Sequence, residues 1–423
     1  MRGVILRCRH LPTCAEYITT VCIICMLLCK GHPLMDFSFL VNIIALLFSF
    51  FVAGAILGAV FSKPIRKKLV ALLRLKRFKF LILDKSLHNP IIKPGTNPWT
   101  AEAVLNPAAA IIDNRTHLIY RAIGMDGVSR LGYASSADGI VFDKRLPYPV
   151  YVAQKPRNLP GRVRRYSPVL YPSGGSWGGC EDPRMVVIEG RVYVIFNMFD
   201  GWDFIRVAAI SIAENDFMKE QFWKWDGPHI LSRPGEIHKN WVLFPEKIDG
   251  KYAILHSVTP KIEVAYRYSI EDIGTTEPFI QSWVGSRNDL PVREDSWDSF
   301  VRGAGPPPVR TGRGWLLFYH AIDERDPGRY KLGAMLLDLS DPTKVLHRSS
   351  APVLSPDEHY ENNGKPGIVY ACGAVVRGGK LFVYYGGADK VICVATAPLD
   401  AFLDELISGS QPSLATMNPA QTA

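Results

Sequence analysis

The sequence predicts an all-β fold, a five-bladed β-propeller preceded by an N-terminal transmembrane helix. Three features lead to this prediction: repeated pairs of apolar strands after residue 80, many turn-forming residues, and one long uncharged span near the N-terminus. The chain of 423 residues contains 35 glycines and 31 prolines, and helix-length periodic segments are scarce after residue 80. This balance is typical of short strands joined by tight turns. A doubly wound α/β fold is the alternative, but it needs helices that the sequence does not supply.

The predicted membrane anchor lies near the N-terminus. Residues 36–62 contain an uncharged apolar run of about 25 residues, long enough to cross a hydrocarbon core of roughly 30 Å as a helix. The basic segment 63–80 follows, and the positive-inside rule places the chain after it on the cytoplasmic side. We therefore expect a membrane-anchored protein with membrane lipid as a partner and its catalytic domain on the cytoplasmic side.

Residues 1–35 allow two interpretations. The apolar stretch 17–29 spans about 13 residues, which is too short to cross a bilayer with ease. It forms one arm of a hairpin, or it is absent because translation begins at Met35. The propeller is expected over residues 81–408, and residues 409–423 are expected to form a flexible tail.

Charge and cysteine usage exclude several classes of function. The formal net charge is +9, but much of it lies in segment 63–80, so nucleic acid is not a predicted partner. Cys180, Cys372 and Cys393 in the globular part lack the spacing of metal ligands or of a disulfide framework. No metal site and no organic cofactor is predicted.

The five repeats each combine an aromatic strand with a second strand that ends in an Ala, Ser or Asp pattern. Their aromatic strands are HLIYRA, VYVIFNM, YAILHS, WLLFYHA and LFVYYGG, and they recur about every 60 to 75 residues. That period suits a four-stranded blade with long loops, so five repeats predict five blades.

A further short strand precedes each aromatic strand, and these strands align as NPAAAII, DPRMVVI, FPEKI, GPPPVRT and ACGAVV. In a propeller, the strands nearest the axis converge on a central channel. Polar residues at equivalent strand starts therefore meet in one pocket, and the candidates are Asn106, Asp182, Glu246 and Lys247.

The segment GGCEDPRMVVI supplies the candidate proton donor. Glu181 and Asp182 stand side by side at the start of a strand that faces the presumed axis. Burial and a neighbouring acid raise the pKa of a carboxyl group, which suits a general acid. We therefore expect Asp182 to donate a proton to a leaving oxygen, with Glu181 beside it.

The globular part resembles glycoside hydrolase family 130, the β-mannoside phosphorylases and β-mannosidases. The matching stretches include LNPAA, GGCEDPR, LFPEKIDGKYAILH, WLLFYHAID and VYYGGAD, and they follow the family order over about residues 85 to 405. The resemblance implies a five-bladed propeller and cleavage of β-mannosidic bonds with inversion. It also implies a β-linked oligosaccharide or glycoside as the substrate.

The resemblance assigns roles to individual residues. Asp182 matches the general acid, which acts through a sugar hydroxyl, and Asn106, Arg121 and Asp389 match positions that hold the sugar. Amide, guanidinium and carboxylate groups also suit sugar hydroxyls on chemical grounds. Two histidines, His256 and His320, end aromatic strands at matching places and are further candidates for substrate binding.

Two reactions remain open. Inverting hydrolysis needs a base that activates water, whereas phosphorolysis uses inorganic phosphate as the nucleophile, held by cations. Lys239, Lys247 and Arg302 are candidate phosphate ligands together with His256, but Ser257 stands where the resemblance implies an arginine. Glu246 is the best-placed candidate base, so the sequence slightly favours hydrolysis.

A third possibility belongs to another class of function. The same pocket on a tethered propeller could bind glycans without cleaving them. Retention of Asp182, Asn106, Arg121 and Asp389 favours an enzyme, because a scaffold has no need of this set.

Overall fold

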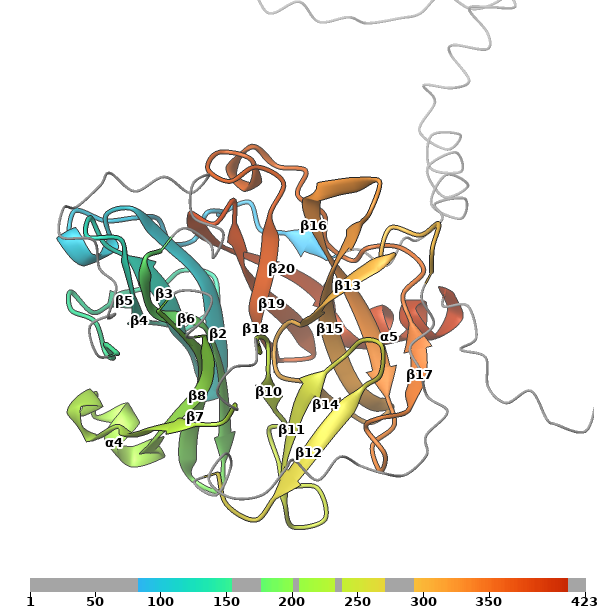
Figure 1. Cartoon of the computed structure of the whole chain (residues 1–423), viewed down its shortest axis with the longest axis horizontal. Helices are drawn as coiled ribbons and strands as arrows, with labels where there is room; N and C mark the ends of the chain where they lie inside the picture. Colours follow the sequence, from blue (N-terminus) through green and yellow to red (C-terminus); the bar gives the residue numbers. More distant parts are fainter. Residues whose placement is uncertain (1–82, 154–175, 201–204, 233–237, 271–292, 410–423) are drawn as a thin grey trace, which may run out of the picture. The chain divides into compact units, whose positions relative to one another are not determined.

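The part of the chain that the structure describes is built almost entirely of β-strands (Figure 1). The structure is a computed structural model, and it describes residues 83–153, 176–200, 205–232, 238–270 and 293–409. The prediction of an all-β chain is confirmed by this composition.

The largest sheet has eight strands in the order β2-β3-β4-β6-β7-β8-β9, with β5 beside β4. Its strands are β2 (Ala103–Ile112), β3 (Arg115–Ile123), β4 (Val128–Ser136), β5 (Lys144–Arg145), β6 (Gly178–Ile188), β7 (Arg191–Phe199), β8 (Arg206–Ala213) and β9 (Asp226–Ile230). Every pairing is antiparallel except β4 with β6, which are parallel over two residue pairs, Val128↔Gly178 and Ser129↔Gly179. This short junction links two antiparallel units, which begin with β2 and β6.

Three further sheets follow along the chain. The first contains β10 (Val242–Leu243), β11 (Tyr252–Ser257) and β12 (Glu263–Arg267). The second contains β13 (Phe300–Ala304), β14 (Val309–Thr311), β15 (Gly314–Asp323), β16 (Asp326–Leu337) and β17 (Val345–Arg348). The third contains β18 (Val369–Arg377), β19 (Lys380–Gly387), β20 (Val391–Pro398) and β1 (Asp84–Lys85). Because β1 pairs with β20, the first described strand completes the last sheet.

Both faces of the sheets are buried, which explains the nearly continuous apolar strands. Successive side chains of a strand point to opposite faces. On β7, Val194 and Phe196 enter one core cluster, whereas Ile195 enters another. On β15, Phe318 enters one core cluster and the adjacent Leu317 enters another. Each sheet therefore packs against a neighbour on either side.

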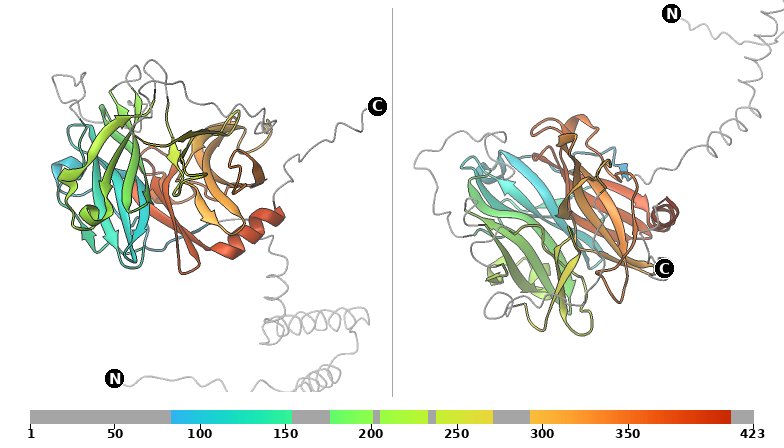
Figure 2. Two further views of the ribbon diagram at one scale, coloured as in Figure 1. Left: turned by 90° about the horizontal axis from the view of Figure 1, so that it is seen from below. Right: turned by 45° about the vertical axis from the view of Figure 1, so that its right-hand side comes forward.

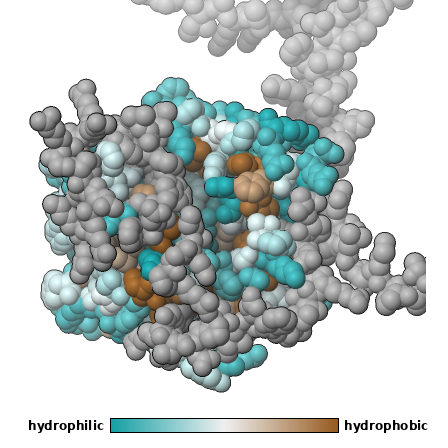
Figure 3. Space-filling model, in the orientation of Figure 1, coloured by the Kyte–Doolittle hydropathy of each residue, from teal (hydrophilic) through white to brown (hydrophobic). Residues whose placement is uncertain are grey.

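The strands that begin each repeat pack against one another. β2 contacts β6 and β18, β6 contacts β10, and β14 contacts β18. In Figure 1, β2, β10 and β18 lie near the middle of the described strands. The face drawn in Figure 3 is hollowed over this region. The polar starts of these strands are thereby brought close together.

The helices of the described residues are short. They are η1 (Pro98–Thr100), α4 (Glu214–Met218), η3 (Phe222–Lys224), η4 (His359–Glu361) and α5 (Leu399–Gly409). The sequence analysis missed α5, although Phe402, Leu403 and Leu406 have helical spacing and are buried against the sheet core. Figure 2 shows α5 on the outside, where it contacts β16, β17 and β20.

The predicted localisation, a membrane anchor with the catalytic domain on the cytoplasmic side, is wrong. Among the described residues, no helix has the length and the apolar character needed to cross a membrane. The predicted segments 1–35, 36–62 and 63–80 lie outside the described residues, as does 410–423 of the predicted tail.

Candidate active site

Two matching bulges bring the first pair of candidate residues together. The register of β2 shifts between Leu105 and Ala108, and that of β6 shifts between Glu181 and Arg184. The residue before proline in each bulge has a left-handed backbone, with φ 49° at Asn106 and φ 50° at Asp182. Such a conformation is costly for a non-glycine residue, and residues before proline favour extended backbone. Bulges of this kind re-aim a side chain.

The two re-aimed side chains meet. The Asn106 Nδ2 amide donates to Asp182 Oδ1 over 2.7 Å, and both residues are buried. The Asn106 Oδ1 oxygen is buried and has no hydrogen-bond partner among the described residues. This oxygen faces the Gly386 backbone, where a Cβ atom would lie 2.2 Å from it.

Arg121, on β3, connects Asp182 to Glu181. Its guanidinium donates from Nη1 to Asp182 Oδ1 (3.2 Å) and from Nη2 to Glu181 Oε1 (2.9 Å). The side chains of Ser129 and Ser176 accept two further bonds from Arg121. Arg121 is only 1% exposed, so its charge stays next to both carboxylates in a setting of low polarity.

The charges around Asp182 outweigh the effect of its burial. Burial by itself raises the pKa of Asp182, but the positive charges of Arg121, Lys239 and Arg184 and the Asn106 hydrogen bond lower it, and the net shift is downward. The sequence analysis expected a raised pKa. These charges instead favour the carboxylate form of Asp182.

Asp389 has the opposite shift. It lies between β19 and β20 with φ 52° and is 7% exposed. Burial raises the pKa of Asp389, Lys365 and Arg121 partly oppose this, and the negative charge of Asp182 adds to the rise. Lys365 Nζ lies 3.6 Å from Asp389 Oδ2. The buried acids of this cluster thus differ in how readily they hold a proton.

Glycine is required where β19 approaches Asn106. A Cβ atom at Gly386 would lie 2.2 Å from Asn106 Oδ1 and 2.9 Å from the Asn106 backbone nitrogen. Contacts this short exclude any side chain at that position without displacement of Asn106. The close approach therefore sets the wall behind the Asn106 amide.

A second network, which the sequence analysis did not identify, holds the backbone of Asp182. Arg184 donates from Nη1 to the Asp182 carbonyl oxygen (2.8 Å) and from Nη2 to Asn240 Oδ1 (2.9 Å). The Tyr370 hydroxyl donates to the same Asn240 oxygen over 2.6 Å. The only sequence signal was the arginine of GGCEDPR, next to the expected site. These contacts fix the strained bulge that carries Asp182.

His320 lies behind Tyr370 and is fully buried. The two rings stack with centroids 3.9 Å apart, and the Ala371 backbone amide donates to His320 Nε2 over 3.0 Å. Burial, helped by the positive charge of Arg184, lowers the pKa of His320 to about 3. The neutral ring therefore carries its proton on Nδ1 and supports Tyr370, so His320 is near the site but shielded from solvent.

The three predicted phosphate ligands Lys239, Lys247 and Arg302 lie at three different positions in the structure. Lys239 joins the cluster, because its Nζ lies 3.4 Å from Glu181 Oε2. Arg302 is exposed beside the cluster, and its backbone oxygen accepts a bond from Asn240 Nδ2 over 3.3 Å. Lys247 lies elsewhere, where it pairs with Glu189 over 2.7 Å in the β6–β7 turn. The structure therefore does not bring Lys247 to Asp182.

Glu246 is not placed as a base for Asp182 chemistry. Its side chain is 48% exposed and accepts a bond from Arg310 Nε over 2.8 Å. No described contact of Glu246 reaches the cluster. His256 lies near Trp241, with ring centroids 5.7 Å apart, and burial together with the charges of His238 and Arg267 lowers its pKa to about 4.

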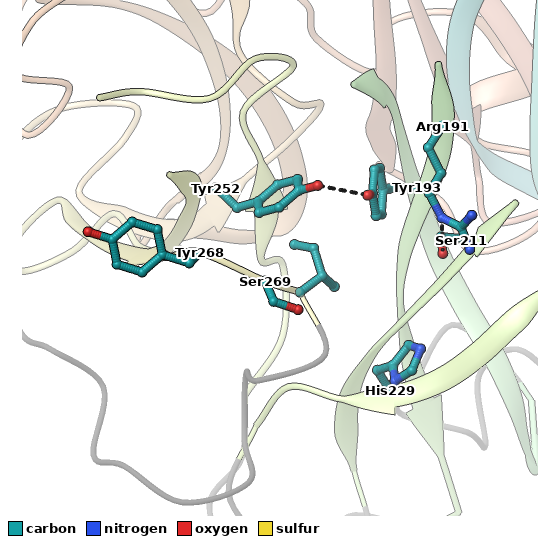
Figure 4. Close-up of a pocket in the computed structure, with 8 residues that line it drawn as sticks. Arg191, Tyr193, Ser211, His229, Tyr252, Tyr268 and Ser269 are labelled. Carbon is teal, nitrogen blue, oxygen red and sulfur yellow. Dashed lines mark hydrogen bonds between the residues drawn. The ribbon is translucent and has the colours of Figure 1, made fainter. Parts of the chain in front are cut away.

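A separate pocket lies at the far end of the β6–β7 hairpin (Figure 4). It has a volume of about 350 Å³ and is lined by Arg191, Tyr193, Ser211, His229, Tyr252, Tyr268, Ser269 and Ile270. The hydroxyls of Tyr193 and Tyr252 are 2.9 Å apart. None of the predicted site residues lines this pocket. Among the described residues, no group of acids, histidines and cysteines is arranged to hold a metal ion.

The sequence profile of glycoside hydrolase family 130, described as β-1,4-mannooligosaccharide phosphorylase, matches residues 87–407. The chain belongs to glycoside hydrolase family 130. The family resemblance in the sequence is thereby confirmed, and so is the prediction of an enzyme of the glycosidase and glycoside phosphorylase class.

Curated members of family 130 match over nearly their whole length. A 1,2-β-oligomannan phosphorylase of Thermoanaerobacter sp. is 36% identical over 322 residues, 74% of this chain and 96% of that protein. A β-1,2-mannobiose phosphorylase of the same organism is 32% identical, with 74% and 96% coverage.

Solved structures share the fold. The β-1,2-mannobiose phosphorylase of Listeria innocua, in complex with β-1,2-mannobiose, matches with a TM-score of 0.58 and 23% identity over 77% of this chain and 99% of that one. A glycosyl hydrolase of Bacteroides ovatus gives a TM-score of 0.58 and 23% identity, with 79% and 96% coverage. At these identities, the likeness concerns the family 130 fold alone.

Proposed function

We propose that the chain cleaves β-mannosidic bonds by phosphorolysis and releases mannose 1-phosphate, with Asp182 as the general acid. The observation that carries the proposal is the buried cluster in which Asn106 and Arg121 both bond to Asp182 Oδ1. Relatives that are 32% to 36% identical and almost fully covered are named as β-mannoside phosphorylases. Their names support inorganic phosphate as the co-substrate and a β-mannoside oligosaccharide as the substrate.

The cluster supplies hydrogen-bonding groups for one mannose unit. Asn106, Asp389 and Arg121 supply an amide, a carboxylate and a guanidinium group, which suit the hydroxyls of a sugar ring. These groups lie on three different strand regions that meet at the bulges. We propose that they bind the mannose whose anomeric carbon reacts.

The proposed phosphorolysis forms one bond and breaks one bond at the anomeric carbon. A phosphate oxygen forms a bond to the anomeric carbon from the face opposite the leaving oxygen, the glycosidic carbon–oxygen bond breaks, and the configuration inverts. The leaving oxygen receives a proton from a sugar hydroxyl, and that hydroxyl receives one from Asp182. The products are α-mannose 1-phosphate and the shortened sugar.

Phosphate binding accounts for how Asp182 acquires its proton. Burial raises the pKa of Asp182, but the positive charges of Arg121, Lys239 and Arg184 lower it further than burial raises it. A bound phosphate dianion offsets these positive charges and raises the pKa of a neighbouring carboxyl group. We propose that the nucleophile thereby prepares the acid, with Lys239 as one of its ligands.

The candidate bases are poorly placed for hydrolysis, the reaction that the sequence slightly favoured. Hydrolysis requires a base that activates water on the face opposite the acid. The candidate base Glu246 is half-exposed and pairs with Arg310, and Glu181 is bound by Arg121 and Lys239. Phosphorolysis needs no such base, because phosphate is already a nucleophile.

We also propose that the five sequence repeats form the five blades of a propeller. The two-residue parallel junction between β4 and β6 supports a division of the large sheet into two blades. Contacts of β2 with β6 and β18, and of β6 with β10, support inner strands that face a common axis. The three smaller sheets then account for the other blades.

Product analysis tests the proposed reaction. The protein is incubated with β-1,2-mannobiose or β-1,4-mannobiose, with and without phosphate at about 10 mM, which is well above a typical KM. The sugar products are then separated by chromatography. Mannose 1-phosphate that forms only with phosphate supports the proposal. Free mannose at equal rates in both conditions indicates hydrolysis. Binding without any product indicates the non-catalytic alternative.

A further inference from the structure

A row of aromatic side chains and one arginine in mutual contact leads from the buried cluster to the surface. It starts at Tyr370, which stacks on His320, and continues to Tyr330, whose ring centroid is 6.4 Å from that of Tyr370. The Arg302 guanidinium carbon lies 5.8 Å from the Tyr330 centroid and 5.2 Å from that of Phe300. We call Tyr370, Tyr330, Arg302 and Phe300 the rim ladder.

Exposure increases along the rim ladder. His320, behind it, is fully buried, and Phe300, at its far end, is 41% exposed. Among the described residues, Phe300 is one of the large apolar side chains that remain exposed, and it is the one in contact with Arg302. The register of β13 shifts between Val301 and Gly303, at Arg302, and the Arg302 guanidinium lies against the Phe300 ring.

The inner end of the rim ladder is bonded to the site. The Tyr370 hydroxyl and Arg184 both donate to Asn240 Oδ1, and Arg184 also bonds the Asp182 carbonyl oxygen. Asn240 in turn donates to the backbone oxygen of Arg302. The ladder therefore has a fixed position relative to Asp182, and it leads away from it toward solvent.

These residues have the chemistry of a sugar-binding surface. Aromatic rings present flat apolar faces, and a planar guanidinium presents several directed donors for hydroxyl oxygens. The Arg302 guanidinium lies near both the Phe300 ring and the Tyr330 ring, and these contacts orient it before a sugar binds. The Arg302 side chain therefore loses less conformational entropy when the sugar binds. A phosphate ligand requires no such aromatic neighbours.

We propose that the rim ladder binds the sugar units that follow the first unit beyond the cleaved bond, and thereby makes the enzyme favour longer β-mannooligosaccharides over disaccharides. This inference rests on the proposed function, because the cluster around Asp182 holds the reacting mannose. The rest of the oligosaccharide must then extend from the buried cluster along a path to solvent. The ladder supplies stacking faces and donors along such a path, with Arg302 as a specificity residue and not as a phosphate ligand.

The test measures binding separately from turnover. In an Asp182→Asn background, isothermal titration calorimetry gives the dissociation constants for a β-mannobiose and the matching mannotetraose without phosphate. The tetraose is expected to bind more tightly, and Phe300→Ala or Arg302→Gln is expected to weaken its binding about tenfold while disaccharide binding changes less than about twofold. In the active enzyme, the same variants reduce kcat/KM for the tetraose and spare the disaccharide.

A matched control variant is available. Lys251 lies over the exposed Tyr268 ring at 5.1 Å, a similar cation–aromatic pair remote from Asp182. Tyr268→Ala is expected to leave the preference for the tetraose unchanged. Arg302→Gln, at an exposed position, keeps the test usable if Phe300→Ala fails to fold.

Two outcomes overturn the inference. Equal affinities for disaccharide and tetraose contradict it, and so does an unchanged ratio of the two affinities in both ladder variants. Failure of the proposed function gives a different result, because absence of phosphorolysis leaves the calorimetric preference intact.

Discussion

Asn106 and Asp182 lie 76 positions apart in the chain, yet their side chains share a hydrogen bond of 2.7 Å from Nδ2 to Oδ1. Both have a left-handed backbone near φ 50° at a bulge, and both precede a proline. The repetition of this costly conformation in two neighbouring strands supports a functional reason for it. We infer that the bulges exist to turn these two side chains toward a substrate.

Asp182→Asn is expected to reduce kcat for an unactivated β-mannoside by about 10² to 10⁴-fold, because the amide keeps the shape but has no proton to transfer as an acid. Calorimetric binding of the sugar is expected to persist. Glu246→Gln is the matched control, and it should retain activity because Glu246 is half-exposed and paired with Arg310. A larger loss in Glu246→Gln than in Asp182→Asn would contradict the assignment of the acid.

Gly386→Ala is expected to impair the site by displacement of Asn106. The new Cβ would stand 2.2 Å from Asn106 Oδ1, and a shift of about 1 Å in a substrate-positioning group can cost about 10²-fold in rate. Steady-state kinetics should show this loss. Gly312→Ala is the control, because no atom lies within 4 Å of its Cβ position. Equal activity of the two variants would show that the wall behind Asn106 is not required.

Arg121→Met is expected to lower the free energy of unfolding by about 3 to 5 kcal/mol, since it leaves Glu181 and Asp182 buried without their shared cation. Urea denaturation measures this value. Arg325→Ala provides the comparison, because its ion pair with Asp323 lies on the surface and should contribute much less to stability. Similar losses in both variants would refute a central role for Arg121.

Because the pKa of His320 is lowered in the folded protein, the free energy of unfolding is expected to decrease in acid. Its pKa is lowered from 6.5 to about 3 in the folded protein, so between these values the unfolded chain binds a proton that the folded chain does not. The stability that depends on neutral His320 is complete above pH 6.5 and decreases by about 1.4 kcal/mol per pH unit as the pH falls toward 3.

His320→Gln removes this titration but keeps a side chain that can accept the Ala371 amide hydrogen bond. Urea unfolding at several values between pH 7 and pH 4 should therefore show a smaller dependence on pH for the variant than for the wild type. His256 titrates in both proteins and does not affect the comparison. Identical slopes would mean that His320 is protonated in the folded state.

The sequence predicted the strands and the bulge residues because these depend on local patterns. Short continuous apolar and aromatic runs define strands such as β7 and β15, and the matching Asn-Pro and Asp-Pro pairs marked the inner strand starts. The α5 helix was missed because its short apolar stripe was interpreted as the end of a strand repeat.

Glu246 shows why alignment by repeat misled the site prediction. In β2 and β6, the residue before proline points to the site, but the equivalent residue in the LFPEKI repeat is Phe244, which is fully buried. Glu246 follows the proline and faces outward to Arg310. Likewise, the bond from Tyr370 to Asn240 joins residues 130 positions apart, and no local pattern encodes such a contact.

The most direct test of the account combines phosphorus and proton NMR on one reaction. Wild-type protein with β-mannobiose and phosphate is predicted to form α-mannose 1-phosphate, and Asp182→Asn is predicted to form it at least about a hundredfold more slowly. The α configuration would establish inversion with phosphate as the nucleophile. One free mannose is expected for each mannose 1-phosphate, because it is the sugar that leaves the disaccharide. Two free mannoses per bond cleaved with no mannose 1-phosphate, or β-mannose 1-phosphate, would contradict the account.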